Sequence, residues 1–288
     1  MSTNSSGRRK RRAGTPLEGS NTNTKTTKTT STSAYNRNFE QKLIDYGVYP
    51  KGYEFSEREF QIFEREDTNA SKEKLVTTTV LPIINGDISD SKCVGGDYLF
   101  GNLAPLTDGT LVNAKPDYFV GARPEQLKPE IRNELNNLSQ SATTPKGGPD
   151  GSSAVATRQA CYNGALGARG IYKLQSYGQE PIFDNNAYTI TSTYQAGQLK
   201  LYTTHPAAPQ ESDGRPEYIM TSLRSFAMTD SLDTFRKGAT AYRNARDWAK
   251  EQRDEFIKSA NERHELLSSE RESTPEPCSP GRSTLAAK

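Results

Sequence analysis

Apolar residues recur every three or four positions in two long segments of the chain, which is the pattern of a helix with one buried face. One segment is Pro124–Leu138, and the other begins near Asp230 or Ser231 and runs to about Leu267. The apolar face of the second segment consists of Phe235, Ala239, Tyr242, Ala245, Ala249 and Phe256. Both segments are therefore predicted to be helices that pack on a core.

Two further helices are predicted from other signals. Ser56 and Glu59 have the spacing of a capping box, which predicts a helix from Glu57 towards Thr68. The segment Ala154–Gly170 is rich in small, helix-favouring residues, and its final glycine is suited to end a helix. Small side chains at this density predict a helix that lies close against a sheet.

Alternating apolar and polar residues predict the strands of that sheet. Ala187–Tyr194 and Gln198–His205 alternate on either side of a short turn that contains Gly197, so they predict a β-hairpin. Tyr218–Phe226 predicts a third strand beside the hairpin.

Shorter segments complete the predicted domain. Strands are predicted at Tyr98–Leu103 and Asp117–Val120, whereas Leu75–Ile84 fits either a strand or the buried end of a helix. Ser139–Ser153 is poor in apolar residues and rich in Pro and Gly, which predicts a loop. This order of elements favours an α/β (α+β) fold, a mixed β-sheet flanked by helices.

Both ends of the chain lack the apolar residues that a core requires. Residues 1–34 and 268–288 consist largely of polar, charged, Gly and Pro residues, so we expect a disordered arm and a disordered tail around one domain at 35–267. In the tail, Thr274 and Ser279 each precede a proline and could accept phosphate. No segment has the length of an apolar membrane span or a secretory signal, so we expect an intracellular protein without membrane contact, nuclear or cytoplasmic.

The net charge of +2 is unevenly distributed. Residues 1–34 contain seven basic residues and one acidic residue, which leaves about −4 for the remaining chain. The arm includes a run of five basic residues, Arg8, Arg9, Lys10, Arg11 and Arg12. This run could bind an import receptor or the phosphates of DNA or RNA, whereas the body would need a local basic patch.

The cysteines and histidines exclude some classes of site. Three cysteines without CxxC spacing and only two histidines argue against a disulfide framework and against a zinc site. Cys161 lies in the alanine-rich segment, where a small buried side chain is expected rather than a nucleophile. His205, followed by a proline, is expected at a strand end.

Several runs of residues resemble an uncharacterised fungal protein family with a PD-(D/E)XK nuclease-like core. The resemblance extends over roughly Tyr35–Arg263. The runs that carry it are Ser33–Glu40, Gly121–Leu127, Arg158–Gly170, Leu174–Gln179, Asp184–Ile190 and Gly238–Ala249.

The resemblance implies a metal site in which Asp117, after Pro116, is the first ligand. The following strand of such a site supplies an acidic residue, one spacer and a lysine. Lys146 matches the lysine, but the acidic position falls on Thr144, and the apolar strand before it is missing from the sequence. Mg²⁺ requires at least two acidic ligands, so Asp117 and Lys146 form an incomplete catalytic site.

Other residues could contribute to this site. Glu130, Glu134 or Asp150 could replace the missing carboxylate, although helix and loop carboxylates are mostly solvated. Arg158 and Gln159 correspond to positions where nucleases of this class hold polar residues near the phosphate, and the alternative is an ordinary pair on a helix surface.

Three functions remain open from the sequence. The first is a degenerate nuclease-like domain that is catalytically impaired and binds nucleic acid, without a cofactor or with Mg²⁺ at a residual site. The second is an active Mg²⁺-dependent DNA endonuclease, and the third is a protein-interaction module without nucleic-acid contact.

The missing apolar strand also bears on stability. Loss of an interior strand would expose sheet edges and lower the stability of the domain.

Overall fold

The computed structural model of the chain describes residues 55–88, 90–100, 106, 113–135, 140–144, 152–210 and 214–273, with the backbone alone at 140–144 and 272–273. The chain divides into two units, Met1–Thr32 and Ser33–Lys288, and every described residue belongs to the second. The predictions for residues 1–34, Lys146, Asp150, Thr274 and Ser279 therefore lie outside the described residues.

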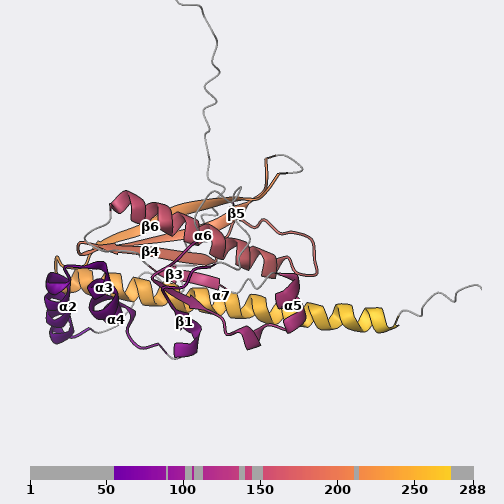
Figure 1. Ribbon diagram of the computed structural model, residues 1–288, viewed down its shortest axis with the longest axis horizontal. Helices are drawn as coiled ribbons and strands as arrows, with labels where there is room; N and C mark the ends of the chain where they lie inside the picture. The colour runs from indigo at the N-terminus through magenta and orange to yellow at the C-terminus, as the bar shows by residue number, and fades with distance from the viewer. Residues whose placement is uncertain are drawn as a thin grey trace, which may run out of the picture. The chain divides into compact units, whose positions relative to one another are not determined.

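The described residues form one six-stranded sheet in which the spatial order of the strands follows the chain. Neighbouring strands are antiparallel except for β3 and β4, which are parallel. Figure 1 shows the strands, which are β1 (Val94–Gly95), β2 (Tyr118–Gly121), β3 (Gln140–Thr144), β4 (Thr189–Gln195), β5 (Gln198–Ala207) and β6 (Glu217–Ala227). The predicted hairpin and the strands predicted at Asp117–Val120 and Tyr218–Phe226 are confirmed.

Strand β3 corrects two predictions. Gln140–Thr144 pairs with β2 on one side and with β4 on the other, so the loop predicted over Ser139–Ser153 is wrong for these residues. The segment reads Gln-Ser-Ala-Thr-Thr and has no apolar alternation, because its place in the sheet comes from hydrogen bonding to both neighbours. An interior strand is therefore present, and the expectation that it is missing from the sheet is also wrong.

Helices lie on both faces of the sheet, as Figure 1 shows. Helix α6 (Ser153–Gln175) connects the parallel strands β3 and β4, and a Cβ atom at Gly164 of this helix would lie 2.3 Å from Thr204 Oγ1 and 3.5 Å from Thr191 Cγ2. Helix α7 (Leu232–Ser273) packs on the opposite face, where Ile190 lies in a buried cluster with alanines of this helix. Successive residues of a strand point to opposite faces of the sheet, so Ile190 faces α7 and Thr191 faces α6.

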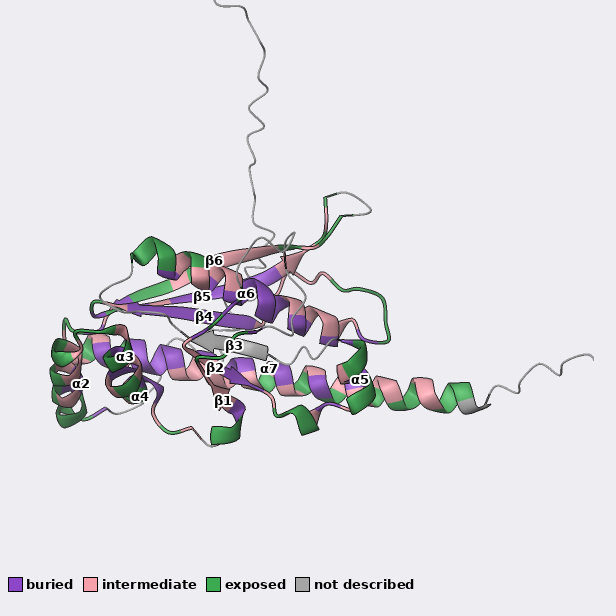
Figure 2. Ribbon diagram, in the orientation of Figure 1, coloured by how far each residue is buried: buried purple, intermediate pink, exposed green. Residues whose placement is uncertain are grey.

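The largest buried cluster joins α2 (Glu57–Asn69) to the sheet and to α7. The ring centroid of Phe63 lies 4.6 Å from that of Phe235 and 6.3 Å from that of Tyr194. The predicted capping box at Ser56 is confirmed, because Ser56 and Glu59 exchange hydrogen bonds between side chain and backbone. Figure 2 shows the buried residues along the sheet and along the face of α7 that meets it.

Leu75–Ile84, for which the sequence allowed either a strand or the end of a helix, is helical. It comprises α3 (Glu73–Leu75), a π-helical turn at Val76–Val80 and α4 (Leu81–Asn85). The hydroxyl groups of Thr77, Thr78 and Thr79 donate hydrogen bonds back to the carbonyl oxygens of Lys74 and Leu75. These bonds, together with burial of the apolar side chains, keep a β-branched segment helical.

Other element boundaries differ from the predictions. The helix predicted over Pro124–Leu138 is a 3₁₀ turn at Pro124–Gln126 followed by α5 (Pro129–Glu134), because the residue before Pro129 is extended. Helix α6 continues past Gly170 to Gln175, and α7 continues past Leu267 to Ser273. The segment Tyr98–Phe100 is not a strand. A further 3₁₀ turn lies at Ser91–Cys93.

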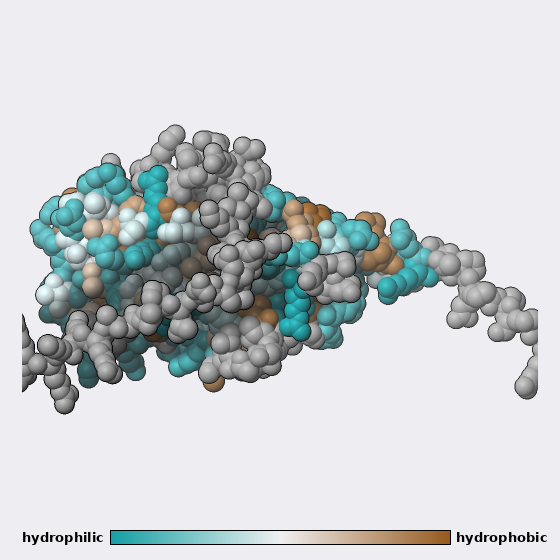
Figure 3. Space-filling model, turned by 90° about the horizontal axis from the view of Figure 1, so that it is seen from above, coloured by the Kyte–Doolittle hydropathy of each residue, from teal (hydrophilic) through white to brown (hydrophobic). Residues whose placement is uncertain are grey.

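The surface of the described residues is mostly polar, and Figure 3 shows one face of it, with small apolar groups among hydrophilic side chains. The large apolar side chains that are exposed are Leu75, Tyr98, Leu99, Val155, Ile182 and Leu266. In the part of the chain that the structure describes, every helix is too short or too polar to cross a lipid bilayer.

Candidate functional site

Asp117 lies immediately before β2, and the turn after β1, Gly96–Asp97, packs against this part of the chain. The Asp97 N–H donates a hydrogen bond to the Pro116 carbonyl oxygen at 3.0 Å, and the Lys115 ammonium lies 3.2 Å from the Asp97 carboxylate. A side chain at Gly96 would bring a Cβ atom within 2.0 Å of the Asp117 carbonyl oxygen, so the turn requires glycine there. Asp117 is half-buried, and its Oδ2 atom is buried.

The register between β2 and β3 brings the two parts of the predicted site to one end of the sheet. Tyr118, the residue after Asp117, pairs with Thr144, the last residue of β3. Thr144 stands at the position where the nuclease pattern has an acidic residue, and a threonine hydroxyl carries no negative charge for a divalent cation. Lys146 comes two residues later in the sequence and lies outside the described residues.

Two of the carboxylates that could replace the missing acidic ligand, Glu130 and Glu134, lie away from Asp117, beside Tyr177. Glu130 and Glu134 belong to α5, and both are close enough to Tyr177 to affect the pKa of its hydroxyl. Within the described ranges, no three His, Cys, Asp or Glu side chains form a group that could hold a metal ion. The residues described around Asp117 therefore do not fit a Mg²⁺ site of the usual acidic composition.

Arg158 and Gln159 lie in the first part of α6, which begins towards the end of the sheet where β3 ends (Figure 1). Arg158 is exposed, so its guanidinium is accessible to a phosphate group. Gln159 is half-buried and its Oε1 atom is buried. Of this pair, the exposed arginine is the better candidate for contact with nucleic acid.

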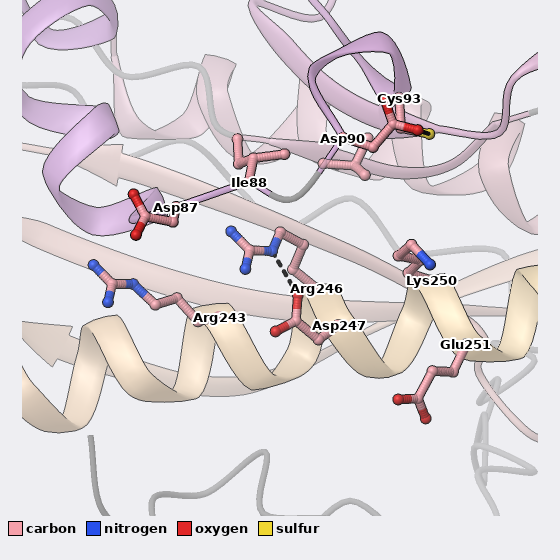
Figure 4. A pocket seen from close by; sticks show the side chains of 10 residues that line it. Asp87, Ile88, Asp90, Cys93, Arg243, Arg246, Asp247, Lys250 and Glu251 are labelled. Carbon is pink, nitrogen blue, oxygen red and sulfur yellow. Dashed lines mark hydrogen bonds and ion pairs between the residues drawn. The ribbon is translucent and has the colours of Figure 1, made fainter.

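A pocket of about 460 Å³ lies beside α7, and Figure 4 shows the charged side chains that line it. Arg243 donates hydrogen bonds from Nε to the Ile84 carbonyl oxygen at 2.9 Å and from a terminal nitrogen to the Ile83 carbonyl oxygen at 2.8 Å. Arg246 donates to the Asn85 carbonyl oxygen at 2.6 Å and to the Asp247 carboxylate at 2.8 Å.

These contacts give the charges of this pocket a structural role. The last carbonyl groups of a helix have no partner within it, and the two arginines supply donors at the end of α4. Lys250, the third cation of the pocket, lies 2.9 Å from the Asp254 carboxylate. The pocket thus marks where α4 is attached to α7, and its cations are already engaged.

Cys161 and His205 are poorly placed for catalysis. Burial raises the pKa of the Cys161 thiol, which disfavours the reactive thiolate. His205 is fully buried near the end of β5, and burial lowers the pKa of its imidazole. A polar pair that the sequence did not reveal is that of Tyr177 and His264, which are 87 residues apart and whose hydroxyl and Nδ1 atoms lie 2.9 Å apart.

The comparisons with known proteins add no family to these observations. No protein-family model matches the chain, and neither a curated protein nor a solved structure matches it.

Proposed function

We propose that this protein is a nuclease-like domain that binds nucleic acid and does not carry out metal-dependent cleavage. The observation that carries the proposal is the pairing of Tyr118 with Thr144. It supports an arrangement in which Asp117 and the strand before Lys146 meet, as the PD-(D/E)XK pattern requires, while a neutral residue occupies the acidic position. A metal-dependent phosphodiesterase with a single carboxylate lacks the charge to hold Mg²⁺ and activate water.

The charge distribution supports binding through the arm and through Arg158. The run Arg8–Arg12 offers five positive charges for phosphate groups, and the rest of the chain is mildly acidic. Binding to a polyanion releases condensed counterions, so its affinity falls with salt according to the number of phosphates neutralised. The same run also supports nuclear import, because import receptors recognise short basic segments.

Binding and cleavage should be measured on the full chain with labelled single-stranded DNA, double-stranded DNA and RNA. We expect binding in EDTA, in Mg²⁺ and in Mn²⁺, without strand cleavage in any of them. Replacing Arg8–Arg12 by alanine should reduce the magnitude of the salt slope on double-stranded DNA by up to about 4.5. Arg158→Gln should weaken binding, whereas Arg65→Gln, which removes an exposed charge on α2, should not.

The metal site has its own test. Thr144→Glu would restore the acidic residue of the pattern, and we expect it to raise the affinity for Mn²⁺ only while Asp117 is present. Cleavage by the unaltered chain that disappears in Asp117→Asn would contradict the proposal and establish an active nuclease. Absence of binding to all three nucleic acids would contradict it in favour of a protein-interaction module.

A further inference from the structure

A second pocket, of about 450 Å³, lies between α5, the C-terminal end of α6 and the last part of α7. The polar side chains on its wall include a carboxylate, an imidazole, two cations and two phenols, which are Glu134, His264, Lys173, Arg271, Tyr172 and Tyr177. Its volume falls in the range of pockets that bind small organic molecules.

Hydrogen bonds between α6 and α7 hold Tyr177 in the wall of this pocket. Tyr177 is 9% exposed, and its hydroxyl shares a hydrogen bond with His264 Nδ1. Arg263 donates hydrogen bonds from Nε to the Tyr177 carbonyl oxygen at 2.5 Å and from a terminal nitrogen to the Leu174 carbonyl oxygen at 2.9 Å. This arginine therefore attaches the end of α6 to α7 and fixes the tyrosine against the imidazole.

The cations of this pocket differ from those of the pocket beside α4. Among the described residues, neither Lys173 nor Arg271 has a carboxylate oxygen within 4.0 Å, whereas Lys250 in the other pocket has one at 2.9 Å. Burial and the nearby Arg169 lower the pKa of Lys173. A bound anion would relieve both effects, because it neutralises the repulsion between the cations and offers acceptors to the ammonium.

The lining of this pocket also includes aromatic and aliphatic side chains that suit a flat apolar group. Tyr172 is stacked on Phe183, with 5.0 Å between ring centroids and 28° between ring planes. Leu135, Pro181 and Leu267 line the same pocket. Aromatic and aliphatic side chains beside a cationic cluster favour a ligand with a ring at one end and negative charge at the other.

We infer that this pocket is a binding site for a small phosphate monoester that carries an aromatic ring, of the size of a nucleoside monophosphate. Lys173 and Arg271 hold the phosphate, and their two positive charges outweigh the single Glu134 carboxylate beside Tyr177 on the same wall. His264 contacts the ligand from the wall, and Tyr172 contacts the ring. This inference does not rest on the proposed function, because neither Asp117 nor Arg158 lines the pocket.

The two histidines provide a direct measurement on the full chain. Imidazole signals in ¹H–¹³C correlation spectra should be followed during addition of dAMP, with adenosine and inorganic phosphate as separate titrations. His264 should shift saturably with dAMP, while His205, which is 0% exposed and belongs to β5, serves as the internal reference. Lys173→Gln and Arg271→Gln should each weaken dAMP binding about tenfold, the usual cost of one charge-assisted hydrogen bond.

The control is Lys258→Gln, which removes the same charge from the exposed surface of α7, where Lys258 lies 4.0 Å from Glu262. Unchanged dAMP affinity in this variant supports the inference. Equal weakening in Lys258→Gln and Lys173→Gln would overturn it, because binding would then be general charge attraction. Equal affinities for dAMP and inorganic phosphate, or no saturable shift of His264 up to about 10 mM dAMP, would also overturn it.

Discussion

Tyr194 and Asp67 are 127 residues apart in sequence, and the Tyr194 hydroxyl donates a 2.5 Å hydrogen bond to Asp67 Oδ1. The bond links β4 to α2 beside the largest buried cluster, where Tyr194 is 1% exposed. It therefore adds a specific polar contact to a junction whose buried side chains are mostly apolar.

Tyr194→Phe should lower the free energy of unfolding by about 1 to 3 kcal/mol, because the change leaves the Asp67 carboxylate without this donor. Urea denaturation of the variant and the unaltered chain would measure the difference. Tyr202→Phe is the matched control, since Tyr202 is a buried tyrosine of β5 that makes no hydrogen bond through its hydroxyl in the described part of the chain. Equal effects of the two changes would contradict the assignment.

Stability should also fall at alkaline pH because of Tyr194, which is buried, and Tyr118, which is half-buried with a buried hydroxyl oxygen. Burial raises the pKa of Tyr118 to about 12, and burial together with the Asp67 carboxylate raises the pKa of Tyr194. A raised pKa in the folded state stabilises the protein below the unfolded value, about pH 10, and this contribution is lost as pH rises towards the folded value. Each tyrosine should then contribute a loss of about 1.4 kcal/mol per pH unit. Urea midpoints between pH 9 and pH 11 would check this, and Tyr194→Phe should show a smaller loss.

The arginines at the end of α4 should contribute more to stability than arginines or lysines in surface ion pairs. Arg243 donates to two carbonyl oxygens of this helix and also lies over the Phe55 ring, with its guanidinium carbon 4.3 Å from the ring centroid. Arg243→Lys keeps the charge but loses the planar fork, so we expect a cost of about 1 to 3 kcal/mol. Lys237→Ala, which breaks an exposed pair with Asp233, should cost at most about 0.5 kcal/mol. Similar costs for both variants would show that the α4 contacts are weak.

Gly164→Ala tests how closely α6 approaches the sheet. In an unconstrained helix this change is stabilising by about 1 kcal/mol, but here the new methyl group would meet Thr204 Oγ1 at 2.3 Å. We expect a net destabilisation of about 1 to 3 kcal/mol. Adding Thr204→Ala should recover part of this loss, and thermal unfolding of the two single variants and the double variant would reveal the coupling. Strictly additive effects would argue that the two positions do not touch.

Much of the fold could be predicted where the signal is local. Both hydrogen bonds of the capping box at Ser56 form within three residues, and the hairpin turn at Gly197, with φ of 71°, is encoded in the turn itself. Strand β3 was missed because Gln140–Thr144 has neither apolar alternation nor strong β-propensity, and only pairing with β2 and β4 makes it a strand.

The candidate site around Asp117 could likewise be predicted only in part. The family resemblance singled out Asp117, and the structure pairs Thr144 with Tyr118, the residue after it. The pocket around Tyr177 and His264 joins residues from helices that are far apart in sequence, and no spacing along the chain indicates such a pair. Arg243 and Arg246 were also not identified, because a helical arginine that caps another helix has the same sequence pattern as one that faces solvent.

Helix α7 follows all the other described elements in the chain, and this order has a consequence for synthesis of the protein. Arg236 of this helix hydrogen-bonds to the Phe55 carbonyl oxygen across 181 residues. At ordinary elongation rates, roughly 10 to 40 s pass between synthesis of these two residues. During that interval Phe60 and Phe63 of α2 have no Phe235 to pack against, so these apolar side chains of the nascent chain lack their native partner until α7 emerges.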